Sequence, residues 1–399
     1  MTRRLYYDNA YLTEFDAYVT TCNRCEGGYQ VTLDQSAFYP TSGGQPYDLG
    51  TLGSARILDV EVDEAGDVLH KVGEPLAVGS LVHGSIQWAR RFDHMCQHCA
   101  DHMIAGVLHR LFHAVTIGLH ISADISTIDV SFPDGRTALS EDEISTVEDI
   151  INAQIREDLP VHCFFPTEEE LSRLPLRKEP TVKTHIRVVG IGHENDIVEM
   201  VACGGTHPST TGQIGLIKII DTAPARGKMR ISFLAGERAY NNYRSTYNNV
   251  HAAAALFSTR PEELSRCIKK LQESFADKER RISLLQKELR AVRLPELLAL
   301  ALPVSGDAKL IKAVLPENTE NLRELASELV AQENIIVLLA NENGDLVFAR
   351  SKNVSRHMGQ LLSDSARKTG GKGGGRPDFA QGKGSAQTLE IAYAELIEK

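Results

Sequence analysis

A cysteine and a histidine stand four positions apart in the segment Cys203–His207, which reads CGGTH. A thiolate sulfur and an imidazole nitrogen are both good ligands for zinc and for similar metal ions. The two glycines between them leave the backbone free to fold closely around such an ion. The segment therefore predicts one half of a metal site, with the remaining ligands supplied from elsewhere in the chain.

The helix expected after Trp88 offers that second half. Its apolar residues recur at helical spacing, and it carries histidines at positions 94, 98, 102, 109 and 113. Histidines four apart share one helix face, so the spacing permits three pairs: 94 with 98, 98 with 102, or 109 with 113. The spacing alone does not choose among these pairs. The HExxH motif of zinc peptidases is excluded, because Cys99 follows His98.

Four stretches of the chain must position these residues. Residues 1–89 carry short alternating runs broken by glycine and proline, which predicts a small β-barrel-like domain. Residues 90–245 mix strand patterns at 126–132 and 185–192 with a helical pattern at 140–155, which predicts an α/β domain holding the metal site. Residues 246–300 predict a long helical linker, and residues 301–399 predict a second small α/β domain. The expected fold class is a multidomain α+β and α/β protein.

The linker helix carries an apolar seam over residues 261–292. The seam follows a 4-3 repeat that is broken only by Lys278, and it consists of Leu264, Ile268, Leu271, Phe275, Ile282, Leu285 and Leu289. Such a coiled-coil-like seam needs a partner. A second copy of the chain would make a homodimer, and an antiparallel helix or the helix's own domain would serve equally well.

Bulk properties exclude several classes of protein. The sequence has no run of eighteen apolar residues and its first residues lack a secretory signal, so we expect a cytoplasmic protein with no membrane segment. Seven scattered cysteines fit reduced thiols and metal ligands better than a disulfide framework, and we take the single CxxC at Cys22–Cys25 as incidental. The net charge of −10 argues against wholesale wrapping of nucleic acid, although it permits a local basic patch.

Five motifs in order along the chain resemble the editing half of alanyl-tRNA synthetase and the free-standing alanyl-tRNA editing proteins called AlaX. They are FYPTSGGQPYDLG (38–50), RRFDHMCQHCADHM (90–103), CGGTHPSTTGQIGLIKI (203–219), RISFLAGERA (230–239) and GGKGGGRPDFAQGKG near the end of the chain. The similarity covers nearly the whole chain. It resembles the long form of the family, which keeps the synthetase's C-terminal domain of the DHHA1 type.

The resemblance selects one set of ligands and implies a reaction. The family's HxxxH falls on His98 and His102, and its CxxxH falls on Cys203 and His207, which leaves His94 idle. The implied cofactor is Zn²⁺ held by these four residues. The implied activity is hydrolysis, in trans and without ATP, of the ester in mischarged tRNA(Ala), carrying serine or glycine. Such a check is needed because a pocket for alanine cannot strongly exclude these two amino acids.

Substrate contacts are expected from two further segments. To hydrolyse seryl-tRNA but not alanyl-tRNA, the pocket must form a hydrogen bond with the serine hydroxyl. The polar candidates are Gln45, Ser126 and Thr127, and we also expect Gln45 and Thr127 to act in catalysis. Gly43 and Gly44 would let the substrate approach the backbone closely. The alternatives stay open, since SGGQP is also ordinary turn sequence and Thr127 equally fits cross-strand packing.

A basic stretch near the C-terminus is the expected contact for tRNA. Between Arg350 and Lys383 the sequence has eight basic residues and two acidic ones, a local charge of +6. Within this stretch the segment Lys372, Gly373, Gly374, Gly375 and Arg376 predicts a glycine-rich loop whose amides and side chains meet phosphates. A flexible surface loop is the plain alternative. Arg90 and Arg91, beside the histidine helix, are expected to guide the acceptor end.

Two other functions compete with editing. A related C-terminal domain occurs in phosphoesterases that degrade short oligonucleotides, which makes a nuclease the enzymatic alternative. Those enzymes resemble one another through an Asp-His-His motif and several metal-binding aspartates, which we do not find in this sequence. The other alternative is a non-catalytic tRNA-binding protein in which zinc is purely structural.

Overall fold

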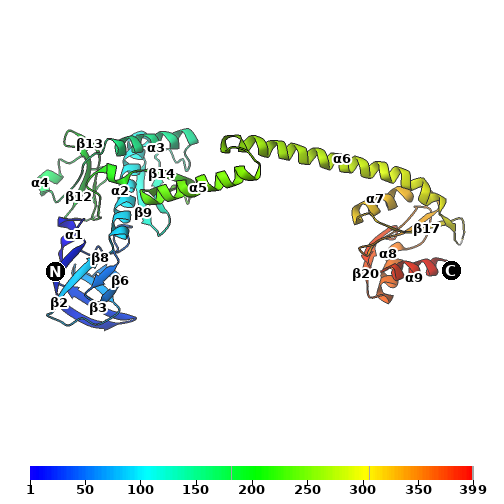
Figure 1. The fold of residues 1–399 in the computed structure, drawn as a ribbon, viewed down its shortest axis with the longest axis horizontal. Coiled ribbons are helices and arrows are strands. Elements are labelled where there is room, and N and C mark those ends of the chain that lie inside the picture. Colours follow the sequence, from blue (N-terminus) through cyan, green and yellow to red (C-terminus); the bar gives the residue numbers. More distant parts are fainter. Residues whose placement is uncertain (181, 305, 398–399) are drawn as a thin grey trace. The chain divides into compact units, whose positions relative to one another are not determined.

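The structure, a computed structural model, describes residues 1–180, 182–304 and 306–397 (Figure 1). The chain divides into two compact units, residues 1–252 and 253–399. The finer division at residues 89, 245 and 300 stays a prediction. Within the described ranges, every helix is either too short or too polar to serve as a membrane span.

Six strands near the N-terminus close into an antiparallel barrel in the order β2-β3-β7-β6-β5-β8, which confirms the predicted barrel. Their bounds are Glu14–Cys25 (β2), Gly28–Leu33 (β3), Gly50–Leu52 (β5), Ala55–Val62 (β6), Val68–Val72 (β7) and Leu81–Ile86 (β8). In β2 the buried residues Phe15, Ala17 and Val19 alternate with exposed ones, as the two-residue period of a strand requires. Beside the barrel, β1 (Arg3–Arg4) pairs in parallel with β4 (Gln35–Ser36), and α1 (Leu5–Asp8) follows β1.

A single long helix, α2 (Trp88–Phe112), leaves the barrel and becomes the centre of the rest of unit 1 (Figure 1). Every residue from His94 to Leu108 is buried, so α2 is covered on all sides rather than along one stripe. The helix ends at Phe112, and the next residue, His113, adopts the left-handed conformation and donates its N–H to the carbonyl of His109.

Two sheets and a second helix surround α2. The four-stranded sheet has the order β14-β15-β10-β9, and the three-stranded sheet has the order β11-β12-β13. α3 begins at Ser140, whose side chain forms a capping box with Glu143. The bounds are Val115–Ile121 (β9), Ser126–Ser131 (β10), Glu141–Arg156 (α3), Val161–Phe164 (β11), Glu168–Leu171 (α4), Val188–His193 (β12), Asp196–Ala202 (β13), Thr211–Ile214 (a 3-10 turn), Ile217–Ala225 (β14), Lys228–Ala235 (β15) and Glu237–Leu256 (α5).

Unit 2 is a mixed sheet covered on both faces, as predicted for a small α/β domain. The strand order is β16-β17-β18-β19-β21-β20, and the central strand β18 is buried along its whole length. Its alternate residues pack into two cores, Ile336 and Leu338 with α8 and α9, and Val337 and Leu339 with α7. The bounds are Leu302–Pro303 (β16), Lys309–Leu315 (β17), Thr319–Leu329 (α7), Ile335–Asn341 (β18), Asp345–Arg350 (β19), Met358–Lys368 (α8), Lys372–Gly375 (β20), Phe379–Lys383 (β21) and Ala386–Ile397 (α9).

The basic glycine-rich segment forms part of this sheet, which corrects the expected loop. β20 pairs with β21 in antiparallel register, Gly373 opposite Gly382. A Cβ at Gly373 would lie 2.8 Å from Leu362 of α8 and 3.0 Å from the Cα of Gly382. Glycine is therefore needed here for close packing of the strand between α8 and β21. Lys372 and Arg376 at its ends are exposed.

The predicted linker of residues 246–300 is interrupted after α5, which ends at Leu256, and its longer part is α6 (Leu264–Ala299), which has 36 residues. Its apolar seam faces solvent within the described chain: Leu271, Phe275 and Ile282 keep 56%, 61% and 54% of their surface exposed. Only its last turns are covered, where Leu297 packs into the core of unit 2. The seam is therefore available to a partner.

His70 on β7 predicts how the barrel responds to acid. Its ring is fully buried, donating from Nδ1 to the carbonyl of Val31 at 3.2 Å and accepting from Ser36 Oγ at 2.7 Å. Burial lowers the pKa of His70 to about 4. Between its unfolded pKa of ~6.5 and this value, the unfolded chain binds a proton that the folded barrel does not, so stability falls as the pH falls.

We therefore expect His70→Gln to remove part of the acid sensitivity. Urea unfolding of unit 1, followed by the fluorescence of Trp88, the single tryptophan, measures it. From pH 7 to pH 4.5 the unfolding free energy of the wild-type chain should drop by about 2 kcal/mol more than that of the variant. Equal losses in the two proteins would contradict the buried neutral state of His70.

Candidate metal centre

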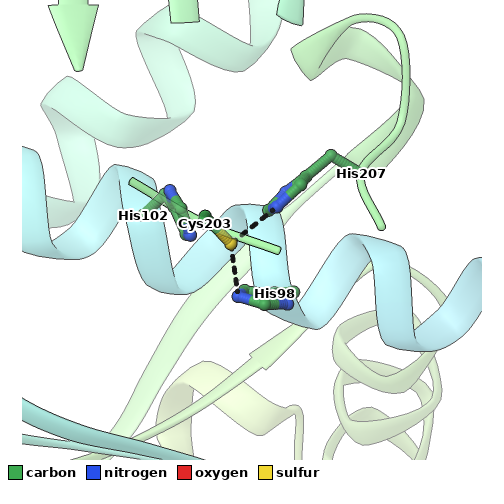
Figure 2. A group of neighbouring side chains, drawn as sticks. All are labelled: His98, His102, Cys203 and His207. Atoms are coloured by element: carbon green, nitrogen blue, oxygen red, sulfur yellow. Dashed lines mark hydrogen bonds between the residues drawn. The ribbon is translucent and has the colours of Figure 1, made fainter. Parts of the chain in front are cut away.

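The two predicted motifs meet at one point (Figure 2). His98 and His102 lie on successive turns of α2, and Cys203 and His207 lie on the segment that follows β13. The Sγ atom of Cys203 is 3.4 Å from Nε2 of His98 and 3.4 Å from Nε2 of His207, and the four ligand atoms all lie within 4.8 Å of one another. Ligands about 2.0–2.3 Å from a tetrahedral zinc ion are about 3.5 Å apart. The group therefore has the size of a site for one ion.

The structure also separates the three histidine pairs that the spacing left open. His94 is buried one turn before His98, and it lies outside the four-residue group. The rings of His109 and His113 are 6.4 Å apart at the far end of α2, where His109 Nδ1 bonds to the carbonyl of Ala114 at 3.2 Å. Among the described residues, only the pair at 98 and 102 joins Cys203 and His207.

The CGGTH segment is held against α2 by a glycine and an arginine. A Cβ at Gly205 would lie 2.2 Å from the His98 ring, so this position accepts only glycine while the ring stays in place. Arg187, at the start of β12, is 5% exposed and donates from Nη1 to the carbonyls of Cys203 at 3.1 Å and Gly205 at 2.7 Å. These contacts fix the position of the thiol relative to the imidazoles.

Gln45 is fully buried and forms a hydrogen bond with His98. Its Oε1 accepts a hydrogen bond from Nδ1 of His98 at 2.8 Å and one from the backbone N–H of Thr206 at 3.3 Å. Its Nε2 donates to Thr206 Oγ1 at 2.8 Å. His98 thus keeps its proton on Nδ1 and presents the Nε2 lone pair to the centre of the group. These contacts indicate that Gln45 positions His98, and its expected catalytic and substrate roles stay predictions.

Gly43 and Gly44, just before Gln45, differ in their surroundings. Gly44, with φ +85°, would place a Cβ 2.2 Å from the carbonyl oxygen of Leu119, so it allows the turn to pack directly on β9. Its own carbonyl accepts from the N–H of Ile121 at 3.0 Å. Gly43 lies on the cavity wall. Of the two, only Gly43 keeps the expected position for a substrate contact.

The protonation states of the four side chains follow from their burial. Burial, assisted by the charge of Arg187, lowers the pKa of His98 to about 3, and burial lowers the pKa of His102 and His207 well below the usual value. Three neutral imidazoles therefore offer nitrogen lone pairs. Burial raises the pKa of the Cys203 thiol to about 12, so its proton leaves readily only when a cation replaces it.

A cavity of about 700 Å³ opens beside the group. His98, His102 and Cys203 form part of its wall, so three of the four donors face the cavity. Much of the remaining wall is polar and basic, with Arg4, Arg177, Lys178, His185 and Arg187 among its residues. A volume of this size is typical of a cavity that binds a small molecule.

Sequence reasoning missed an acidic residue in this wall. Asp101 lines the cavity at 6% exposure, and its Oδ1 has no hydrogen-bond partner among the described residues. Burial raises the pKa of Asp101 to about 7, against the opposing charge of Arg177. Its position in HCADH, three residues after His98, was the available signal, because that spacing places it on the face of α2 that carries the histidines.

Ser126 and Thr127 on β10 do not line the cavity, which corrects their expected roles. Ser126 is fully buried facing α2, where its Oγ donates to Oε1 of Gln97 at 3.3 Å. Because successive side chains of a strand point to opposite faces, Thr127 points away from α2. Neither residue is placed to contact a substrate at the metal group, and Thr127 is not placed for catalysis.

Arg91 is also corrected. It is fully buried, its Nε donates to both carboxylate oxygens of Asp48 at 2.9 and 3.0 Å, and its Nη1 donates to the carbonyl of Ala10. A guanidinium committed in this way joins α2 to the barrel and cannot reach a phosphate. Arg90 is half-buried over the ring of Tyr47, and its contact with tRNA stays a prediction.

Comparison with known proteins places this geometry in a family. The model of the threonyl and alanyl tRNA synthetase second additional domain matches residues 186–232, and the DHHA1 domain matches residues 307–399. The alanyl-tRNA editing protein AlaX-L of Pyrococcus horikoshii is 31% identical over 100% of this chain and 98% of its own length. The chain belongs to the AlaX family of alanyl-tRNA editing proteins.

The AlaX family shares this region with larger enzymes. The alanine–tRNA ligase of Pyrococcus furiosus is 32% identical over 100% of this chain but only 43% of its own length, so the chain spans less than half of that relative. The solved C-Ala domain of alanyl-tRNA synthetase from Aquifex aeolicus is 27% identical and covers 25% of this chain and 98% of its own, with a TM-score of 0.23.

In this AlaX-family protein, we expect Gln45→Ala to weaken metal binding. Loss of the bond that orients a ligating histidine typically lowers metal affinity by about 10- to 100-fold. Competition of the purified protein with a zinc-binding dye measures this, and Gln35→Ala, on the barrel side of unit 1, is the matched control. Unchanged zinc affinity together with a raised KM would instead restore Gln45 as a substrate contact.

Proposed function

We propose that this protein corrects mischarged tRNA(Ala) by hydrolysing the ester of Ser-tRNA(Ala), with Gly-tRNA(Ala) as a second substrate. One observation carries the proposal: three imidazoles and a thiol converge beside a polar cavity in a member of an editing family. The polar cavity and the printed name of AlaX-L, an alanyl-tRNA editing protein, support the choice of an aminoacyl ester and of tRNA(Ala).

Zinc is the metal that best suits this donor set. Nitrogen and sulfur donors in a group of this size fit a tetrahedral Zn²⁺ ion, and the Nε2 atoms of His98 and His207 each lie 3.4 Å from Sγ of Cys203. When bound, zinc supplies Lewis acidity that polarises an ester carbonyl or activates water. Hydrolysis would require one of the four positions to open or a fifth ligand to be accepted.

The residues of the chain itself would bind and orient the 3′ end of the tRNA. Arg4, Lys178 and Arg187 bring positive charge to the cavity wall, which suits the terminal phosphate. The guanidinium groups of Arg4 and Arg187 lie 5.8 and 5.3 Å from the centre of the Tyr7 ring. An aromatic ring flanked by cations suits stacking of the terminal adenine. The buried walls around His98 and Cys203 would limit access of bulk water to the ester.

More distant parts of the tRNA would contact exposed basic residues. Arg90 stands at the start of α2, and Lys372, Gly373, Gly374, Gly375 and Arg376 form the edge strand β20 and the residue after it. At an edge strand, exposed side chains and unpaired backbone amides are both available to phosphates. The protein is expected to act in the cytoplasm, where aminoacylated tRNA is used.

Deacylation of defined substrates tests this function. We expect release of serine from Ser-tRNA(Ala), slower release of alanine from Ala-tRNA(Ala), and loss of both after treatment with a chelator. His102→Ala should lower kcat/KM by at least about 100-fold, because it removes a ligand from the metal. His109→Ala, a histidine on the same helix outside the group, is the matched control and should retain activity.

Two results would favour the competing functions. Cleavage of the RNA backbone, rather than of the ester, would identify a nuclease. A protein that binds tRNA but releases no amino acid, and that unfolds when His102 is replaced, would identify a structural metal in a non-catalytic binding protein. Circular dichroism of the His102→Ala variant separates loss of chemistry from loss of fold.

The seam of α6 is proposed to form a homodimer. Its apolar residues are exposed on a 4-3 repeat, and a second copy of the same helix offers an equally spaced seam. We expect a dimer in solution by light scattering, and we expect Leu271→Glu with Phe275→Glu to give a monomer. The matched control is Lys270→Glu with Glu273→Lys, outside the seam. A monomeric wild-type protein would contradict the dimer and would leave the proposed chemistry intact.

A further inference from the structure

We propose that Asp101 binds the free α-ammonium group of the aminoacyl ester, so that the enzyme accepts aminoacyl-tRNA and rejects tRNA whose amino acid is blocked at nitrogen. The inference rests on the proposed function, because it concerns how that substrate is recognised. It assigns the cavity a chemical class of ligand: an α-amino ester with its ammonium group free.

The position of Asp101 is unusual for an acidic side chain. It is 94% buried and faces the cavity, and its Oδ1 has no hydrogen-bond partner among the described residues. Burying a carboxylate that lacks a partner costs free energy, and buried polar groups in folded proteins are almost always satisfied. Because Asp101 also borders the cavity, a donor that arrives with the ligand can complete its hydrogen bonding.

The nearest charged groups do not satisfy Asp101. Arg177 pairs with Glu199 at 2.8 Å and donates from Nη1 to Thr116 at 2.8 Å, and both members of this ion pair are more than nine-tenths buried. Lys178 is exposed. In the described part of the chain, Asp101 takes part in no ion pair, although Arg177 and Lys178 contribute positive charge and Glu199 negative charge around it.

The chemistry of the substrate supplies the missing donor at the right place. An aminoacyl ester carries its ammonium group on the carbon next to the ester carbonyl, and hydrolysis breaks the bond between that carbonyl carbon and the ribose oxygen. Asp101 lies between two residues of the metal group along α2, three after His98 and one before His102, and it shares the cavity with both. An ammonium group has three donors and no acceptor, so it matches an unpaired carboxylate by charge-assisted hydrogen bonds.

Binding of non-hydrolysable analogues tests the inference directly. The probes are 3′-seryl-amide derivatives of 3′-amino-3′-deoxyadenosine, one with the α-amine free and one with a hydroxyl in its place. By calorimetry, the wild-type protein should bind the amine about 10- to 100-fold more tightly than the hydroxyl analogue. Asp101→Asn should bind both with the weaker affinity. Asp129→Asn, the same change on β10, is the matched control and should retain the preference.

Hydrolysis of free and N-acetylated substrates provides a second, independent test of the role of Asp101. Wild-type protein should cleave Ser-tRNA(Ala) and leave N-acetyl-Ser-tRNA(Ala) largely intact, and Asp101→Asn should raise KM for Ser-tRNA(Ala) while its zinc content stays at the wild-type level. Equal binding of the two analogues by wild-type protein overturns the inference. The inference is also overturned if Asp101→Asn binds the analogues like wild-type protein but has a kcat that is equally reduced for both tRNAs. Asp101 would then act in proton transfer.

The outcomes separate this inference from the proposed function. If wild-type protein releases serine from blocked and free substrates at the same rate, deacylation stands and recognition of the ammonium group by Asp101 is wrong. If wild-type protein releases serine from neither tRNA, the proposed function is wrong, and preferential binding of the amine analogue still decides whether the cavity recognises an α-ammonium group through Asp101.

Discussion

Three buried imidazoles and a half-buried thiol meet at one place, and several parts of unit 1 hold them together. Burial removes the proton from His98, His102 and His207 and keeps it on Cys203, so the group is neutral and rich in lone pairs. A small divalent cation would stabilise this group, because it replaces the thiol proton and is bound by the imidazole nitrogens.

Much of the surrounding structure serves the geometry of this group rather than the substrate. Gln45 belongs to a turn that follows β4, and the hydrogen bonds of its side-chain amide link His98 of α2 to Thr206 of the CGGTH segment. Arg187 holds the same segment from β12, and the ion pair of Arg91 with Asp48 fastens α2 to the barrel. The barrel therefore contributes to the site mainly by fixing the direction of one imidazole ring.

Spacing left three histidine pairs open, and the resemblance of the motifs selected His98 and His102, which the structure groups with Cys203 and His207. The positions of the polar residues around these donors were not predicted. The residue types in HxxxH and CxxxH are metal ligands in many folds, so the sequence shows them directly. The two-residue period correctly predicted the barrel strands. Gln45 was found from its motif, but its burial and its hydrogen bonds to His98 and Thr206 depend on the packing of distant segments, which a sequence pattern does not show. Thr127 failed for a simpler reason, since a strand pattern does not say which face meets the helix. Asp101 was overlooked between two stronger signals.

The coordination of the bound metal tests this account most directly. X-ray absorption at the zinc edge, on protein purified with its metal, should show one zinc per chain with nitrogen ligands at about 2.0–2.1 Å and one sulfur at about 2.3 Å. The sulfur contribution should disappear in Cys203→Ser, while the fold measured by circular dichroism persists. Zinc coordinated without sulfur in the wild-type protein, or a folded protein with no affinity for zinc, would contradict the central claim.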